Sequence, residues 1–193
     1  MRFRERGVGY ERLRARTGEA RTRVDRPQSS PANCGRIAAT VYEGGDMAPI
    51  TASIEIDCPP EKVFDYLSQL DRHDEWQDAV KTIEVLTPGP TAVGSQARIT
   101  REGPGGDQTM AYEMTEVDGP RSFAFKGIDG SIRPVGRVVL SPLDGGARTK
   151  YDFEFDFETH GLTGKMFGKM ARRGAEKEIP EDLARLKAKL ESS

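Results

Sequence analysis

Few side chains in this sequence are suited to acid–base chemistry, and they lie far apart. The two histidines are His73, in the charged segment 71–76, and His160, just before the last helical pattern. General acid–base catalysis needs an acid and a base that reach the same substrate. We expect His73 to be solvated and His160 to cap or hinge the start of the last helix, so the sequence assigns a catalytic role to neither.

Arg101 and Glu116 are better placed to belong to a site inside the fold. Arg101 continues the alternation of Ala97 and Ile99, which predicts that its guanidinium points inward near a strand end. An inward arginine could orient a carboxylate or an enolate. Glu116 keeps the alternation of Met114 and would point the same way. The alternative is that both side chains lie in water at fraying strand ends.

Cys58 precedes two prolines at a predicted helix start, where a thiolate is stabilised. No base is adjacent to it in the sequence, so a small packed side chain is the alternative interpretation. Cys34 and Cys58 form neither a disulfide framework nor a metal-ligand motif. The glycine-rich run 103–106 precedes a strand, whereas phosphate-binding loops precede a helix. The sequence therefore predicts no metal site and no cofactor.

The near-neutral charge of the chain is the sum of two unlike parts. The 193 residues hold 29 basic and 31 acidic side chains, for a net charge of −2. Residues 1–46 contain 10 Arg, no Lys and 6 acidic residues (net +4), and residues 47–193 contain 19 basic and 25 acidic residues (net −6). The lack of an overall basic excess disfavours nucleic-acid binding. No apolar run approaches the roughly 18 residues of a membrane-spanning helix.

Residues 1–46 are predicted to form a disordered, Arg-rich leader, because they lack a sustained hydrophobic period and include the linker-like stretch 27–35. They have no apolar run of the secretory type, and their acidic residues argue against a transit peptide. We therefore expect a cytoplasmic protein. A basic arm for nucleic acid or anionic lipid is one alternative. Another is that Met47 is the true start and that the leader is not translated.

Residues 47–193 are predicted to form one domain of short strands and a few helices. Residues 50–56 alternate apolar and polar side chains, as a half-buried strand does. A short helix follows from Pro59, and a polar turn or second short helix covers residues 71–76. Six further strands with tight turns between them are expected at 80–86, 94–101, 108–117, 122–126, 131–140 and 148–158. This spacing describes an antiparallel meander.

The C-terminal segment has the apolar spacing of one long amphipathic helix. Its apolar positions recur at three or four residues, with one wider gap: Leu162, Met166, Met170, Ile179, Leu183, Leu186 and Leu190. Gly168, Gly174 and Pro180 are expected to weaken or bend its middle. An α+β fold follows, in which the sheet buries its apolar face against this helix. Twisted antiparallel sheets curl, so we expect a cavity that one helix cannot fill.

Six segments have the order and spacing of a known family. They are residues 54–67 (IEIDCPPEKVFDYL), 70–76 (LDRHDEW), 93–95 (VGS), 117–123 (VDGPRSF), 140–146 (LSPLDGG) and 182–191 (DLARLKAKLE). Together they resemble the bacterial polyketide cyclase/dehydrase-like SRPBCC family of the START and birch-pollen-allergen superfamily, over about residues 49–191. The resemblance implies a helix-grip fold, in which a curved seven-stranded antiparallel sheet wraps a long C-terminal helix and two short helices follow the first strand. It also implies a cavity for a lipid, polyketide or aromatic compound.

Methionine and aromatic side chains on the strands and the last helix are the predicted lining of this cavity. The flexible methionine side chain adapts to the shape of a ligand, and aromatic walls suit planar or hydrophobic ligands. Alternating aromatic residues are, however, also typical of an ordinary core. The predicted ligand-binding residues are Trp76, Arg101, Met110, Tyr112, Met114, Phe123, Phe125, Tyr151, Phe153, Phe155, Met166 and Met170. Trp76 either closes the cavity mouth or packs the short helices onto the sheet.

Three functions from different classes remain open. The resemblance implies relatives that are aromatase/cyclases, carriers of lipids or quinones, or activators of a chaperone ATPase, and the fold does not choose among them. We expect first a protein that binds or carries a hydrophobic small molecule. The alternatives are a cyclase/dehydratase-like enzyme, favoured by inward ionisable side chains, and a protein-interaction module, favoured by a filled core. The sequence leaves the ligand and the oligomeric state open.

Overall fold

The fold is described by a computed structural model of residues 48–103 and 106–192, and the predicted leader lies outside these residues. The elements, with η for a short 3-10 helix, are β1 (Ile50–Ile56), α1 (Pro60–Leu67), η1 (Leu70–Glu75), β2 (Val80–Val85), β3 (Gln96–Gly103), β4 (Gly106–Asp118), β5 (Ser122–Gly127), β6 (Ile132–Leu143), η2 (Asp144–Gly146), β7 (Arg148–Thr159) and α2 (Gly161–Glu191). The strands and helices expected from periodicity are therefore present in the expected order.

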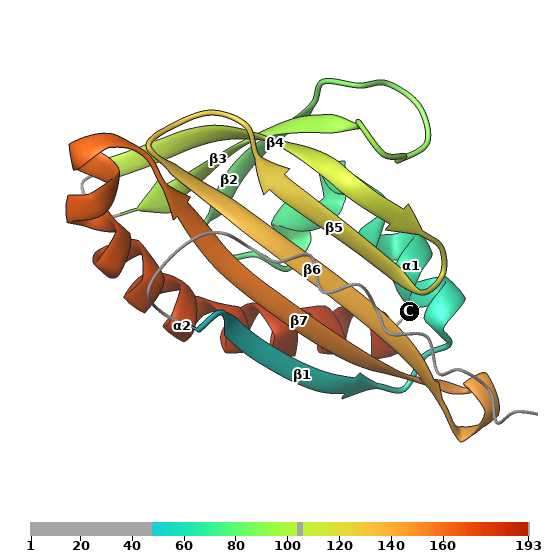
Figure 1. Ribbon diagram of the computed structural model, residues 1–193. Coiled ribbons are helices and arrows are strands. Elements are labelled where there is room, and N and C mark those ends of the chain that lie inside the picture. Colours follow the sequence, from blue (N-terminus) through green and yellow to red (C-terminus); the bar gives the residue numbers. More distant parts are fainter. Residues whose placement is uncertain (1–47, 104–105, 193) are drawn as a thin grey trace, which may run out of the picture. The chain divides into compact units, whose positions relative to one another are not determined.

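The seven strands form one antiparallel sheet in the order β1-β7-β6-β5-β4-β3-β2. From β2 to β7, each strand pairs with the next one in the sequence. The first strand, β1, pairs with the last, β7, and places Ile54 opposite Tyr151. After β7 the chain turns back, and α2 runs along one face of this sheet (Figure 1). The predicted α+β helix-grip fold is confirmed.

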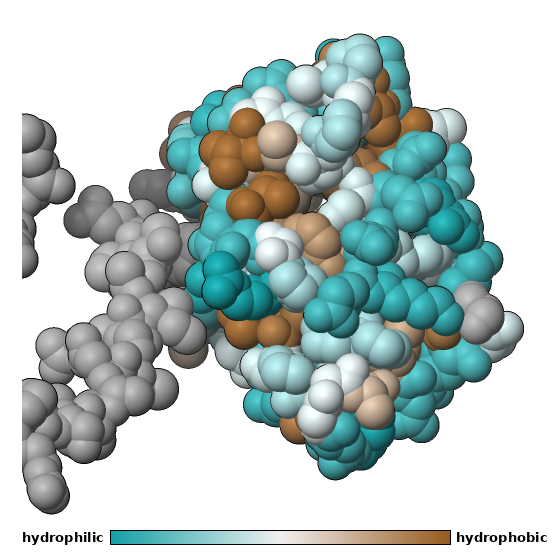
Figure 2. Space-filling model, turned by 90° about the vertical axis from the view of Figure 1, so that its right-hand side faces the viewer, coloured by the Kyte–Doolittle hydropathy of each residue, from teal (hydrophilic) through white to brown (hydrophobic). Residues whose placement is uncertain are grey.

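Alternation along the strands decides which side chains meet the helix. In β7, Tyr151 and Phe155 are buried on the α2 side, and the acidic residues between them are only partly buried. On the opposite face the hydroxyl of Ser53 donates to Asp152 Oδ1 at 2.7 Å. The side of the protein drawn in Figure 2 is mainly hydrophilic, with hydrophobic atoms in small separate areas. The apolar surface of the sheet is therefore directed toward the helices.

The core lies between the sheet, α1 and the C-terminal half of α2. Ile56 on β1, Val63 and Leu67 on α1, and Leu186 on α2 are almost completely buried. Their spacing within each helix is that of an amphipathic face. Full burial of one such side chain stabilises a fold by about 1.5–3 kcal/mol. This cluster therefore fixes the C-terminal half of α2 against the sheet.

The N-terminal half of α2 packs against the sheet through glycines instead. A Cβ on Gly164 would overlap the carbonyl oxygen of Ser131, and a Cβ on Gly168 would lie 2.8 Å from Thr159 Cγ2. Only the missing side chains allow the helix backbone to come so close to the ends of β6 and β7. The glycines therefore decide which face of this half of the helix meets the sheet.

The prediction that Leu162, Met166 and Met170 continue the buried face of the helix was wrong. Their side chains are 88 %, 68 % and 44 % exposed, respectively. They recur every fourth residue, as expected for one face of a helix, but the glycine face takes the position against the sheet. The apolar stripe consequently faces solvent.

A bulge in β4 corrects a second expectation. Met114 pairs with Phe125 and Glu116 pairs with Ala124, so two steps along β4 match one step along β5. The extra residue, Thr115, reverses the alternation beyond it. Glu116, predicted to point inward, therefore emerges on the opposite face of the sheet.

The outward position of Glu116 is fixed by two partners. Its carboxylate accepts hydrogen bonds from the Ser122 hydroxyl at 2.5 Å and from Arg137 Nη2 at 2.9 Å. The Arg137 guanidinium and the Ser122 hydroxyl hold the pKa of Glu116 below its ordinary value. Glu116 therefore contributes an ion pair between β4 and β6 on the outer face.

Candidate functional site

A cavity of about 140 Å³ lies between the concave face of the sheet and α2. It is lined by 23 residues from the end of α1, η1 and the two residues that follow it, β3 to β7 and α2, and most of its wall is apolar or aromatic. Ten of the twelve residues predicted to bind a ligand line it: Trp76, Arg101, Met110, Tyr112, Met114, Phe123, Phe125, Tyr151, Phe153 and Phe155. Met166 and Met170, exposed on α2, do not.

Aromatic rings from neighbouring strands pack into a continuous wall. The ring centroids of Tyr112 and Phe125 are 5.7 Å apart, those of Phe153 and Phe155 are 5.6 Å apart, and those of Phe155 and Phe157 are 4.9 Å apart. Edge-to-face and tilted pairs at these distances are favourable. Gly136 on β6 leaves the space that the Phe125 ring occupies, since a Cβ there would overlap it.

Two buried polar atoms on this wall have no hydrogen-bond partner among the described residues. They are the indole Nε1 of Trp76 and the hydroxyl of Tyr112. The two side chains are only 8 % and 7 % exposed, respectively. Burial raises the pKa of Tyr112 to about 12, so its hydroxyl keeps its proton at neutral pH. A buried donor without a partner costs about 1–3 kcal/mol, which makes these two donors the natural anchors for a ligand.

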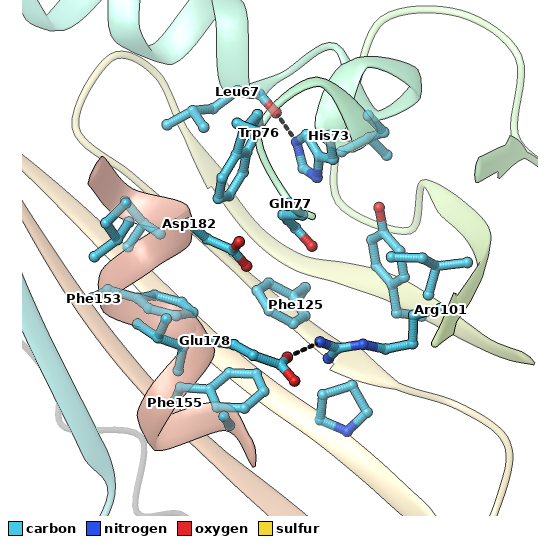
Figure 3. Close-up of a pocket in the computed structure, with 18 of the residues that line it drawn as sticks. Leu67, His73, Trp76, Gln77, Arg101, Phe125, Phe153, Phe155, Glu178 and Asp182 are labelled. Carbon is cyan, nitrogen blue, oxygen red and sulfur yellow. Dashed lines mark hydrogen bonds and ion pairs between the residues drawn. The ribbon is translucent and has the colours of Figure 1, made fainter. Parts of the chain in front are cut away.

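The polar end of the cavity is built by β3 and α2. Arg101 points inward and pairs with Glu178, as the close-up shows (Figure 3). Asp182 lies one helical turn further along α2, so both carboxylates share a face. The Arg101 and Glu178 side chains are 25 % and 39 % exposed. This end of the cavity therefore meets solvent, whereas the other end is lined mainly by aromatic rings.

Asp182 is a partly buried carboxyl of the cavity wall. Burial raises its pKa above the ordinary value, although Arg185 and the Asp78 backbone act in the opposite direction. The Arg185 Nη1 donates to Asp182 Oδ1 at 2.8 Å, and the backbone N–H of Asp78 donates to the same oxygen at 3.3 Å. A carboxyl with a raised pKa in a cleft is a candidate acid–base group.

His73 is only partly exposed and lines the cavity, which corrects the expectation of a solvated side chain. Its Nε2 lies 2.8 Å from the carbonyl oxygen of Leu67, and its ring meets Trp76 edge-on at 5.5 Å. Because a carbonyl oxygen only accepts, Nε2 carries the proton in this arrangement, and Nδ1 is then an acceptor. Burial lowers the pKa of His73, so the ring is neutral at neutral pH. The turn η1 brings it to the cavity wall.

The remaining candidates lie away from the cavity. Cys58 is 2 % exposed and burial raises its pKa, so it is a packed thiol rather than an activated thiolate. His160 occupies the position before α2 but its side chain forms no capping hydrogen bond. Its Nε2 is 3.6 Å from Glu158 Oε2 on an exposed surface.

Sequence reasoning missed four polar residues of the wall: His73, Gln77, Glu178 and Asp182. A signal was available for two of them. Glu178 and Asp182 each immediately precede an apolar position of the buried helix face, Ile179 and Leu183. Acidic residues at four-residue spacing along the border of a buried face point toward the same space as that face.

The described residues contain no helix that is long and apolar enough to cross a membrane. Within the same residues, no group of three or more His, Cys, Asp or Glu side chains is placed to hold a metal ion.

A curved antiparallel sheet that grips a long helix around an apolar cavity defines a helix-grip fold. The chain belongs to the "Polyketide cyclase / dehydrase and lipid transport" family, whose model matches residues 47–191. No curated protein sequence matches the chain.

Several solved structures share this fold. The Zhui aromatase/cyclase from Streptomyces sp. R1128 is 18 % identical with a TM-score of 0.64, over 74 % of this chain and 93 % of that one. TTHA0849 from Thermus thermophilus is 19 % identical with a TM-score of 0.61, over 74 % and 96 % of the two chains. A START superfamily protein from Mycobacterium smegmatis is 19 % identical with a TM-score of 0.59, over 76 % and 99 %. At these identities the likeness establishes the fold.

Proposed function

We propose that the protein binds or carries a hydrophobic small molecule in the cavity between the sheet and α2. The observation that carries this proposal is the pair of unpartnered donors, Trp76 Nε1 and the Tyr112 hydroxyl, in an otherwise apolar wall. Buried polar groups in folded proteins are nearly always paired. A ligand with a carbonyl or other acceptor oxygen would pair them, while its apolar part contacts the phenylalanine rings.

The size of the cavity favours a compact ligand. A volume of about 140 Å³ is near that of an engineered cavity known to hold benzene, roughly 150 Å³. Most ligand sites are larger, about 300–1,000 Å³. We therefore favour an aromatic compound of one or two rings over a lipid chain or an extended polyketide, which would require α2 to move outward. The presence of a cavity also disfavours the third alternative, a protein-interaction module, for which a filled core is expected.

Trp76 is the only tryptophan of the chain and lines the cavity, so it reports binding directly. We would titrate the protein with 2-naphthol, menadione and oleate and record tryptophan emission, alongside native mass spectrometry of protein purified from its source. A saturable change with the ring compounds is expected. The absence of saturable change with every probe, and of any bound molecule in the mass spectrum, would overturn the proposal.

A cyclase/dehydratase-like enzyme is the second candidate, and the polar end of the cavity favours it. Asp182 with its raised pKa could donate a proton, neutral His73 could accept one, and Arg101 could stabilise an enolate. The test is the intramolecular aldol condensation of a β-polyketone mimic, in which aldol addition forms a carbon–carbon bond and dehydration of the resulting alcohol then releases one water. Turnover that Asp182→Asn abolishes, with ligand binding retained, would establish the enzyme. Binding without turnover would leave a carrier.

A further inference from the structure

We infer that the N-terminal half of α2 is a docking surface for anionic lipid bilayers. Four of the six large hydrophobic side chains exposed in the described part of the chain lie within nine residues of this helix. They are Leu162, Met166, Phe167 and Met170. Elsewhere in α2 the large apolar residues are buried or partly buried. The exposed stripe, which we call the outer stripe, is therefore a distinct feature of the helix.

The outer stripe is a property of the helix and not of a disordered end. Gly164 and Gly168 hold this half of α2 against the ends of β6 and β7. Leu162, Met166 and Met170 follow one another at four-residue intervals, so they form a single line on the opposite side. A rigid scaffold therefore presents them together, spread over about 12 Å of helix at a rise of about 1.5 Å per residue.

Basic side chains flank the outer stripe on the same side of the helix. Lys169 and Arg173 lie three residues after Met166 and Met170, respectively, and Lys177 lies one turn beyond Arg173. All three are exposed, and none forms an ion pair with any residue of 48–103 or 106–192. By contrast, the nearby Arg172 is turned inward, where it pairs with Asp156 at 3.3 Å.

The local charge is opposite to that of the domain. Residues 161–177 contain five basic residues and one acidic residue, whereas residues 47–193 as a whole carry a net charge of −6. Exposed apolar residues bordered by Lys and Arg are typical of helices that lie in the plane of a bilayer interface. The apolar side chains enter the acyl boundary, and the long basic side chains reach the headgroups.

A bilayer fits this surface better than a second copy of the chain does. A two-fold dimer would place each outer stripe against its copy, so Lys169, Arg173 and Lys177 would approach their own counterparts. Glu176, the one acidic residue between Lys169 and Lys177, is already paired with Arg172, so these like charges repel one another, whereas the negative surface of an anionic leaflet attracts them. The surface would allow the protein to collect or deliver a hydrophobic ligand at a membrane, although bilayer docking does not depend on what the cavity holds.

The experiment is co-sedimentation of the full chain with vesicles of phosphatidylcholine, alone or mixed with phosphatidylglycerol. Binding is expected only to the mixed vesicles and is expected to weaken as salt is added. The variant Leu162→Ser/Met166→Ser/Met170→Ser should lose at least about tenfold in affinity. Replacement of Lys169, Arg173 and Lys177 by Gln should reduce affinity by about fivefold for each charge.

Two controls test whether the outer stripe itself is responsible for vesicle binding. Val93→Ser removes another exposed apolar side chain, 65 % exposed outside α2, and should leave vesicle binding unchanged. Light scattering of each variant reports the oligomeric state. Three results would each overturn the inference: no binding to mixed vesicles, binding that the triple Ser variant retains because the Arg-rich leader supplies it, and a dimer that the triple Ser variant dissociates. The substituted side chains are exposed, so unchanged thermal unfolding is expected throughout.

Discussion

Arg101 on β3 and Glu178 on α2, 77 residues apart in the sequence, form an ion pair across the polar end of the cavity. The pair links the sheet to the helix beside the solvent-facing end. It also means that the one guanidinium in the cavity wall already has a carboxylate partner. A ligand that carries its own carboxylate must compete with Glu178 for Arg101.

This competition gives opposite expectations for two variants. Arg101→Gln should weaken binding of 2-naphthoate by about tenfold, because a charge-assisted hydrogen bond is lost. Glu178→Gln should strengthen it, because Arg101 is released. Binding of neutral 2-naphthol serves as the control and should change little in either variant. Parallel changes for both ligands would show that the substitutions act through the shape of the cavity instead.

The Tyr112 hydroxyl gives a prediction about stability. Tyr112→Phe removes a buried polar group that has no partner among the described residues, so the free energy of unfolding of the ligand-free protein should stay equal or rise by up to about 1–3 kcal/mol. Affinity for an acceptor-bearing ligand such as menadione should fall. Urea denaturation and tryptophan titration measure the two effects.

Tyr66 supplies the matched control for Tyr112. It is similarly buried, but its hydroxyl donates to Glu75 Oε2 at 3.2 Å. Tyr66→Phe should therefore lower the free energy of unfolding by about 1 kcal/mol. A loss of stability in both variants would indicate that the Tyr112 hydroxyl has a partner, such as a bound water, in solution.

The partly buried His73 predicts a loss of stability in mild acid. Burial lowers its pKa in the folded protein, whereas in the unfolded chain it titrates near its ordinary value of about 6.5. Between these two values only the unfolded chain is protonated, so protons favour unfolding. The free energy of unfolding should be highest above about pH 6.5 and fall as the pH drops toward the lowered pKa.

The measurement is urea unfolding at several pH values for the native chain and His73→Gln. Asp182 has a raised pKa, so its protonation favours the folded state and acts in the opposite direction. The difference between the two proteins isolates His73, because Asp182 is common to both. In His73→Gln the free energy of unfolding should no longer decline just below about pH 6.5. Identical plots of the free energy of unfolding against pH for the two proteins would show that His73 has the same pKa in the folded and unfolded chains.

Gly136 controls the space available to the aromatic wall. A Cβ at this position would overlap the Phe125 ring and lie 3.2 Å from Phe153 Cε2. In Gly136→Ala both rings must shift, which should cost about 1–3 kcal/mol of stability and reduce probe affinity. In Gly174→Ala the new Cβ lies 3.7 Å from Glu178 Oε1. The free energy of unfolding of this helical control variant should rise by up to about 1 kcal/mol. Thermal unfolding measures both variants.

Most of the fold follows from local patterns in the sequence. Strands such as 50–56 alternate strictly, turns such as 118–120 contain glycine and proline, and seven short strands followed by a long helix have few ways to pack. The strand residues of the cavity wall were predictable for the same reason. Once β4, β5 and β7 are in register, alternation alone places Tyr112, Phe125 and Phe153 on one face.

The errors have a different origin, because they depend on contacts that periodicity does not contain. The bulge at Thr115 shifts register between two strands, and only their pairing reveals it. From the sequence alone, Gly164 and Gly168 are expected to weaken the helix. In the fold they are the positions at which the helix contacts the sheet. His73 was assigned to solvent from its charged neighbours, although its own side chain turns inward to Leu67.

The pairing of β1 with β7 also determines when the cavity can exist during synthesis. Ile54 pairs with Tyr151, which is synthesised 97 residues later, so β1 cannot join the sheet before β7 has been made. The helix that covers the aromatic face is synthesised after all seven strands. Contacts this distant slow folding, so the aromatic side chains of β7 stay uncovered until α2 has been made and has packed against the sheet. The acidic residues that alternate with them along β7 keep like-charged chains apart during that interval.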